Sequence, residues 1–114
     1  MANPKPERDV KMSDINTKSL KSDAAGMKQA AKILRTGGLL AFPTETVYGL
    51  GADATQNFAV ARLYAAKGRP NFNPLIAHFS DAASAKSHVK WSEEAEILSN
   101  AFWPGAMTLV LEKR

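Results

Sequence analysis

Residues 39–51 of the chain read LLAFPTETVYGLG, an apolar run that passes directly into a polar segment with two glycines. The run 39–42 is short and ends at Pro43, which is typical of a buried strand that hands over to a loop. We therefore predict a strand over 39–42 and a loop from Pro43 to about Thr55. In open α/β sheets, ligands usually bind at the loops that follow strands.

Helical signals lie on both sides of this segment. Before it, Asp23 is a suitable N-cap and Gly37 a suitable stop for an amphipathic helix. The apolar face of that helix is predicted to hold Met27, Ala30, Ala31 and Leu34. After it, a helix is predicted from Asn57 to about Gly68, because Pro70 excludes helical backbone angles from the residue before it. The inner face of this second helix is predicted to hold Val60, Leu63 and Tyr64.

The rest of the chain continues the alternation of strands and helices. Strands are predicted over 75–79 and 107–111, and helices after the N-caps Asp81 and Ser92. The residues of the last helix predicted to face inward are Leu98, Ala101 and Phe102. The pattern is that of an α/β fold, but three strands make a thin core, so we expect the sheet to be completed by further sequence.

Composition agrees with a globular domain. Of the 114 residues, 45% are hydrophobic and 23% are charged, which supports one hydrophobic core. Residues 1–22 are polar and lack periodicity, so we predict a flexible tail over 1–22 and a single domain portion over 23–114. No apolar run reaches the roughly 18 residues of a membrane span or resembles a signal peptide, so we expect a cytoplasmic protein without membrane contact.

The residue types exclude several kinds of chemistry. The chain has no cysteine, which rules out disulfides, thiolate metal sites and a cysteine nucleophile. The two histidines, His78 and His88, have no clustered carboxylates beside them, so no protein-bound metal is expected. Gly49 and Gly51 lack the third glycine and the following helix of a dinucleotide fingerprint, so Rossmann and P-loop folds are rejected.

Two polar segments are candidates for ligand binding. Thr44 and Thr46 carry hydroxyls that can bond an amino acid or a phosphate, although a turn in which they cap local backbone and Tyr48 packs is equally consistent. Lys67 and Arg69 supply a compact charge and a planar fork, which suit phosphate. The prolines at 70 and 74 stiffen that connection, but a solvated basic turn is the alternative and is slightly favoured by residue type alone.

Two later positions also have a structural alternative. His78 lies in an apolar run, where a satisfied structural histidine is commoner than a catalyst. The segment 103–105, with Thr108, fits a ligand-facing corner and equally fits a turn that a buried Trp103 anchors.

Four blocks in this order resemble the signature of the YrdC-like threonylcarbamoyl-AMP synthase family. The blocks are 43–51, 67–75, His78 and 102–109, and the resemblance covers about residues 25–112. It implies an α/β fold with a twisted mixed sheet, flanking helices and a large cavity. The family domain runs further and has a later Ser-x-Asn motif with no counterpart here, so the chain would be the N-terminal portion of a truncated domain.

The resemblance also implies an activity. Family members are nucleotidyltransferases that make threonylcarbamoyl-AMP and pyrophosphate from L-threonine, bicarbonate and ATP, for the threonylcarbamoyl-adenosine modification of tRNA. ATP would bring Mg²⁺ with it. Further partners would be tRNA or other RNA and the tRNA threonylcarbamoyl transferase complex.

The resemblance assigns roles to particular residues. Thr46 and His78 would contact threonine, and Lys67, Arg69 and Asn73 would bind the phosphates of ATP, with Lys67 and Arg69 as the catalytic cations. Further candidates are Thr44, Tyr48 and Thr108.

Other functions stay open. A non-catalytic RNA-binding module would use the cations of the tail, but few aromatic residues lie among them for base stacking. An inactive fragment of the synthase is another alternative. The related domain of hydrogenase-maturation carbamoyltransferases handles a carbamoyl adenylate, but it normally lies in a larger chain with zinc-finger cysteines, and this chain has none.

Overall fold

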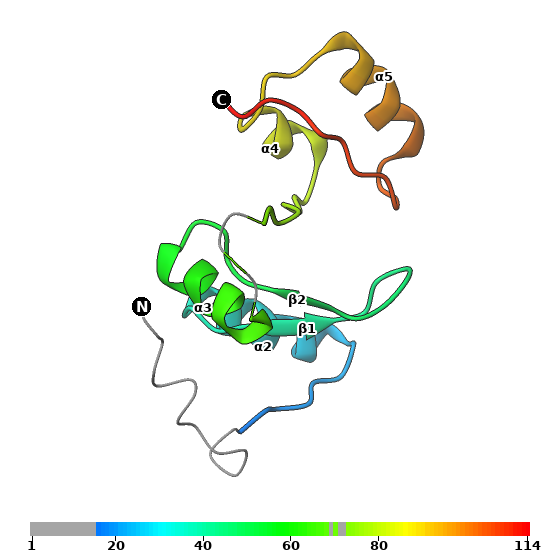
Figure 1. Ribbon diagram of the computed structural model, residues 1–114. Helices are drawn as coiled ribbons and strands as arrows, with labels where there is room; N and C mark the ends of the chain where they lie inside the picture. The colour runs from blue at the N-terminus through cyan, green and yellow to red at the C-terminus, as the bar shows by residue number, and fades with distance from the viewer. Residues whose placement is uncertain (1–15, 69, 71–72) are drawn as a thin grey trace. The chain divides into compact units, whose positions relative to one another are not determined.

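The computed structural model describes residues 16–68, 70 and 73–114. The elements follow the order α2 (Ala24–Arg35), β1 (Leu40–Phe42), β2 (Gly49–Gly51), α3 (Asn57–Lys67), α4 (Ala82–Lys86) and α5 (Glu93–Phe102) (Figure 1). Contacts divide the chain into two compact units, residues 1–74 and 75–114. The predicted α/β class is confirmed: the described residues form helices in both units and one two-stranded antiparallel sheet in the first.

The strand pair lies in the first unit and includes a strand that the sequence did not indicate. Phe42 of β1 pairs with Gly49 of β2, and Leu40 pairs with Gly51. A Cβ at Gly51 would lie only 2.8 Å from the Phe42 ring, so the glycine leaves room for this ring. The prediction of an unbroken loop to Thr55 is therefore wrong. Glycine has a low strand propensity, which argued against a strand here, but close packing against Phe42 requires the glycine.

The helices of the first unit begin and end where the sequence predicts. The Asp23 carboxylate accepts a hydrogen bond from the Gly26 amide at 2.8 Å, as an N-cap does. Gly68 ends α3 with φ of 62°, a left-handed conformation that glycine adopts without strain. Leu63 is buried on the inner face of α3 as predicted, whereas Met27 of α2 is 63% exposed and does not belong to the core.

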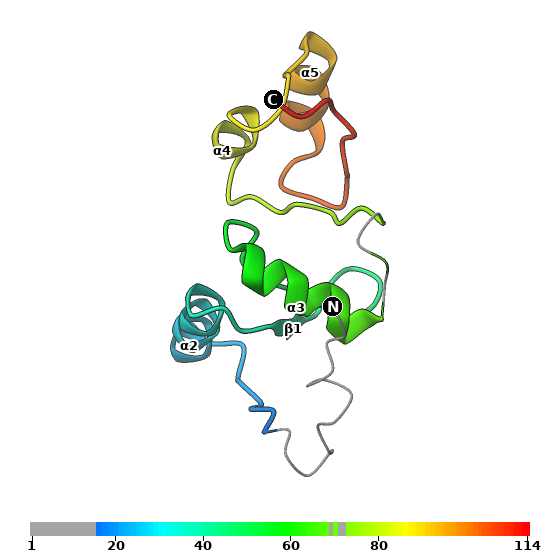
Figure 2. The same ribbon diagram turned by 60° about the vertical axis from the view of Figure 1, so that its left-hand side comes forward.

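The second unit is organised around Glu96 of α5. Its Oε1 accepts a hydrogen bond from the Trp91 indole at 2.8 Å and forms an ion pair with Lys86 of α4, also at 2.8 Å. The C-terminal segment returns beside the connection between α4 and α5, as Figures 1 and 2 both show. An antiparallel bridge between Val89 and Lys113 fixes this return.

The inward face predicted for α5 is wrong. Ala95 and Ser99 are the buried residues of this helix. The residues predicted to be inside, which are all exposed, are Leu98, Ala101 and Phe102. Small residues form the packed side because the described part of the second unit provides nothing that covers the large ones.

The two later strands are not formed among the described residues. Segments 75–79 and 107–111 lie outside any ladder. Burial still alternates along 107–111, and Val110 is 93% exposed. A strand persists only when its backbone groups find partners, so the side-chain pattern is correct while the strand prediction is wrong.

Most of the predicted flexible tail, residues 1–15, lies outside the described residues. In the described part, Leu20 is half-buried and lines a shallow hollow together with Ile33 of α2. Among the helices that the structure describes, none has the length and apolar character needed to span a bilayer.

Candidate functional site

The turn between β1 and β2 carries Thr44, Thr46 and Tyr48. The Thr44 hydroxyl accepts a hydrogen bond from the Thr46 amide at 3.2 Å and donates one to the Val47 carbonyl. These bonds close the turn, so Thr44 acts as a local cap here. Thr46 is exposed and Tyr48 is 74% exposed, which makes both accessible to a ligand.

The C-terminal end of α3 carries a cation. Lys67 lies in the last turn with an exposed side chain, where it also complements the negative end of the helix dipole. Gly68 follows as the cap, and its amide donates to the Ala65 carbonyl at 3.1 Å. Arg69, the second predicted cation, lies outside the described residues.

Asn73 is tied to the same end of α3. Its amide donates a hydrogen bond to the Pro70 carbonyl at 3.1 Å. Its carbonyl accepts a hydrogen bond from the Tyr64 hydroxyl at 2.5 Å. Tyr64 and Lys67 are about one helical turn apart, so the structure brings Lys67 and the Asn73 backbone to the same helix end.

The remaining candidates, His78 and Thr108, belong to the second unit and are both exposed. Thr108 follows a turn in which the Trp103 indole donates to the Met107 carbonyl at 2.7 Å. That bond, with the half-buried ring, agrees with Trp103 as a turn anchor. The candidates therefore divide into a group in the first unit and a pair in the second.

Lys67 presents an exposed positive charge at the end of α3. The described residues give Lys67 no ion pair, whereas Lys86 and Lys90 of the second unit are paired with Glu96 and Glu112. Within the same described part, no three histidine or carboxylate side chains gather in a way that could hold a metal ion. A phosphate is a suitable partner for such an exposed ammonium group.

Sequence reasoning missed the junction that positions α3. The side-chain amide of Gln56 donates hydrogen bonds to the Arg35 carbonyl at 2.9 Å and to the Asp53 carboxylate at 3.0 Å. The Thr55 hydroxyl donates to Asp53 at 2.6 Å, and the hydrogen bonds from Thr55 and then Gln56 lower the pKa of the Asp53 carboxyl. The Asp53–Thr55 spacing is a local turn signal, but no local signal identifies the distant partner of Gln56.

The fold and these positions define an α/β protein with a hydroxyl-bearing hairpin turn and a cationic helix end. The model of the Sua5/YciO/YrdC family, described as "Telomere recombination", matches residues 32–114. The chain belongs to the Sua5/YciO/YrdC family, which confirms the resemblance found in the sequence.

Individual relatives cover the same region. The chain is 47% identical over 96 residues to a threonylcarbamoyl-AMP synthase of Bacillus subtilis, covering 83% of this chain and 28% of the relative. It is 54% identical over 85 residues to that of Pyrococcus abyssi, covering 74% and 25%. A crystal structure of P. abyssi Sua5 complexed with L-threonine matches with a TM-score of 0.77 and 48% identity, covering 82% of this chain and 28% of that one. The chain thus spans little more than a quarter of the length of these relatives.

Proposed function

We propose that residues 23–114 form the N-terminal portion of a YrdC-like domain that makes threonylcarbamoyl-AMP and pyrophosphate from L-threonine, bicarbonate and ATP. The observation that carries the proposal is the 47% and 54% identity to two threonylcarbamoyl-AMP synthases. Because the chain spans 28% and 25% of these relatives, the proposal concerns a protein in which further sequence completes the site.

The proposed reaction is a nucleotidyl transfer. The threonine amine and bicarbonate first give a carbamate with release of water, and a carbamate oxygen then forms a bond to the α-phosphorus of ATP while the bond to pyrophosphate breaks. Such a transfer needs reactants held in line and phosphate charge neutralised, and little covalent help from the protein. Lys67 and Arg69 are proposed to neutralise that charge, and Mg²⁺ would arrive with ATP.

The proposed substrate contacts rest on the family resemblance of the candidate residues. Thr46, exposed on the turn that Thr44 closes, is proposed to contact threonine together with His78. The threonine complex of the P. abyssi protein, at 48% identity, supports an amino-acid site in this family. Asn73 is proposed to bind the phosphates, and Tyr48 and Thr108 to line the site.

The test is threonine- and bicarbonate-dependent release of pyrophosphate from ATP, measured for the chain together with a polypeptide that supplies the rest of the relatives' domain. Lys67→Ala and Arg69→Ala should each lower the rate about 100-fold, as expected when one donor to developing charge is removed. Lys90→Ala, which removes an exposed cation paired with Glu112, is the matched control and should keep the rate. Rates near that of the unsubstituted protein in the Lys67 and Arg69 variants would contradict the assignment.

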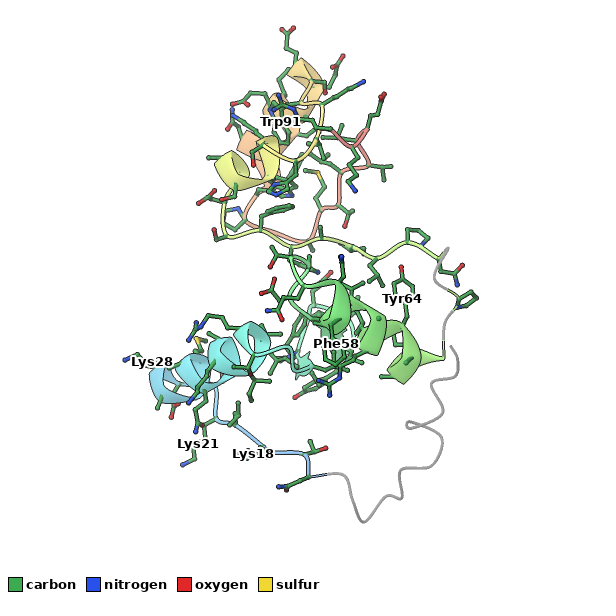
Figure 3. All side chains as sticks on the ribbon, turned by 90° about the vertical axis from the view of Figure 1, so that its left-hand side faces the viewer. Lys18, Lys21, Lys28, Phe58, Tyr64 and Trp91 are labelled. Carbon is green, nitrogen blue, oxygen red and sulfur yellow. The ribbon has the colours of Figure 1, made fainter. Side chains whose placement is uncertain are left out.

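RNA is a proposed partner because the product serves tRNA modification. Exposed cations of the first unit support this, and three of them are labelled in Figure 3: Lys18, Lys21 and Lys28. Binding to phosphate backbones through such cations weakens steeply with salt. Calorimetry with tRNA at two salt concentrations measures it, and an absence of salt-sensitive binding would remove RNA as a direct partner of this chain.

A further inference from the structure

Tyr64 carries a hydrogen bond that the sequence pattern does not explain. Its ring projects from α3 (Figure 3) and is half-buried, and its hydroxyl donates to the Asn73 carbonyl at 2.5 Å. The helical spacing accounts for an apolar ring at this position, but a phenylalanine would supply the same ring. What tyrosine adds is a donor that reaches a residue nine positions further along the chain.

With this bond, the second backbone group of Asn73 is also hydrogen-bonded. The Asn73 amide already bonds the Pro70 carbonyl at 3.1 Å, so both of its backbone groups are engaged. The chain leaves α3 at Gly68 in a left-handed conformation, and no described atom lies within 4 Å of the place where a Cβ would be. The Tyr64 bond ties Asn73 back to α3.

We propose that Tyr64 is a positioning residue for the phosphate-binding end of α3. It does not touch the ligand: it holds the Asn73 backbone, and thereby directs the Asn73 side chain toward the phosphates that Lys67 neutralises. The inference rests on the proposed function, since it requires that Asn73 and Lys67 bind ATP. Donors held in place before binding lose less freedom on binding, so the loss of the Tyr64 bond should weaken ATP more than threonine.

The test uses Tyr64→Phe in the chain together with the polypeptide that supplies the rest of the relatives' domain, with ATP and L-threonine titrated separately by calorimetry. Removing one hydrogen bond should raise the Kd for ATP roughly threefold to tenfold, while the Kd for threonine changes by less than about twofold. Gln56→Leu is the matched control, because it removes a bond that joins α2 to α3 without involving Asn73. It should lower the melting temperature and leave the Kd for ATP unchanged.

A double-mutant cycle shows whether Tyr64 acts through Asn73. In an Asn73→Ala background the side chain to be positioned is gone, so Tyr64→Phe should then change the ATP affinity by less than about twofold. Nuclear magnetic resonance gives an independent signature. The side-chain amide signal of Asn73 should shift on ATP addition in the unsubstituted chain and shift much less in Tyr64→Phe.

The experimental outcomes distinguish a failure of the Tyr64 role from a failure of the proposed nucleotide site. If Asn73→Ala weakens ATP binding but Tyr64→Phe does not, the role of Tyr64 is overturned and the nucleotide site stands. Equal losses of ATP and threonine affinity, with a lower melting temperature, would assign Tyr64 a general structural role and also overturn the inference. If ATP does not bind, or if Lys67→Ala and Asn73→Ala leave its affinity unchanged, the proposed nucleotide site fails and the inference fails with it.

Discussion

At the residue scale, Glu96 shows how one carboxylate organises the second unit. A single oxygen of Glu96 bonds both the Trp91 indole and the Lys86 ammonium group, and that ammonium group lies 5.5 Å from the centre of the Trp91 ring. The hydrogen bond from Lys86, followed by that from Trp91, lowers the pKa of the Glu96 carboxyl below its ordinary value of 4.5. The sequence shows only a glutamate in a polar first turn, a position typical of solvent exposure.

The pKa of Glu96 predicts a dependence of stability on pH. Because its pKa is lower in the folded chain, the native state binds fewer protons there, and the stabilisation is present above about pH 4.5 and is lost as the pH falls through the native pKa. Glu96→Gln should therefore reduce the loss of stability on acidification. Urea unfolding at pH 7 and at several values below 4.5 measures this.

Part of the acid sensitivity should survive in that variant, because hydrogen bonds from Thr55 and from Ser84 also lower the pKa values of Asp53 and Asp81. Glu112→Gln is the control, since the Glu112 carboxylate forms an exposed ion pair with Lys90. If Glu96→Gln and Glu112→Gln show the same pH dependence, the Glu96 contacts do not stabilise the fold.

At the element scale, helix ends and strand pairing differ in how far apart their determinants lie. Asp23 and Asp81 cap their helices through bonds to amides three residues away, and Gly68 ends α3 by its own backbone conformation. These signals are contained in a few adjacent residues and were predicted correctly. β2 depends instead on Phe42, which lies seven residues before Gly49, so its formation was not visible from local propensity.

Gly26 gives a prediction at this scale. Alanine normally stabilises a helix by about 1 kcal/mol relative to glycine. Here a Cβ at Gly26 would lie 1.7 Å from the Lys21 carbonyl oxygen, which is a backbone atom. Gly26→Ala should therefore destabilise the fold, by about 1–3 kcal/mol as in other overpacked sites, as measured by urea unfolding.

The neighbouring position supplies the control for Gly26. Ala25 is exposed in the same turn of α2, so Ala25→Gly should show the ordinary propensity effect, a loss of about 0.5–1 kcal/mol. An increase in stability for Gly26→Ala would show that the segment before α2 does not pack against its first turn.

At the scale of the whole molecule, the described residues bury little large apolar surface. Among the described residues, the buried hydrophobic ones are three alanines and Leu63. Val110, Ile76 and Phe102 are among the large hydrophobic residues that are exposed. Hydrophobic stabilisation grows with the apolar area removed from water. The matched region is 28% of the length of the B. subtilis relative, and we expect further sequence of this kind to cover these side chains.

The chain should accordingly gain stability from that remaining part. Alone, it should bind the dye ANS through its exposed apolar side chains and melt over a broad range. Together with a polypeptide that supplies the rest of the domain, it should bind less dye and melt more than about 10 °C higher. Differential scanning calorimetry and dye fluorescence measure both, and a sharp melting transition that the second polypeptide leaves unchanged would contradict the expectation.

The sequence by itself determined the α/β class, the helix boundaries, the family and the candidate residues from Thr44 to Thr108. Caps and helix breakers depend on residues within a few positions of one another, and the family follows from four motifs whose order along the chain is read directly. Only the tertiary structure decided that Gly49–Gly51 is a strand, that 75–79 and 107–111 are not, and that Tyr64 holds Asn73. Those outcomes depend on whether a residue distant in the sequence is present to complete a ladder, fill a space or accept a hydrogen bond. A local sequence pattern does not identify that residue.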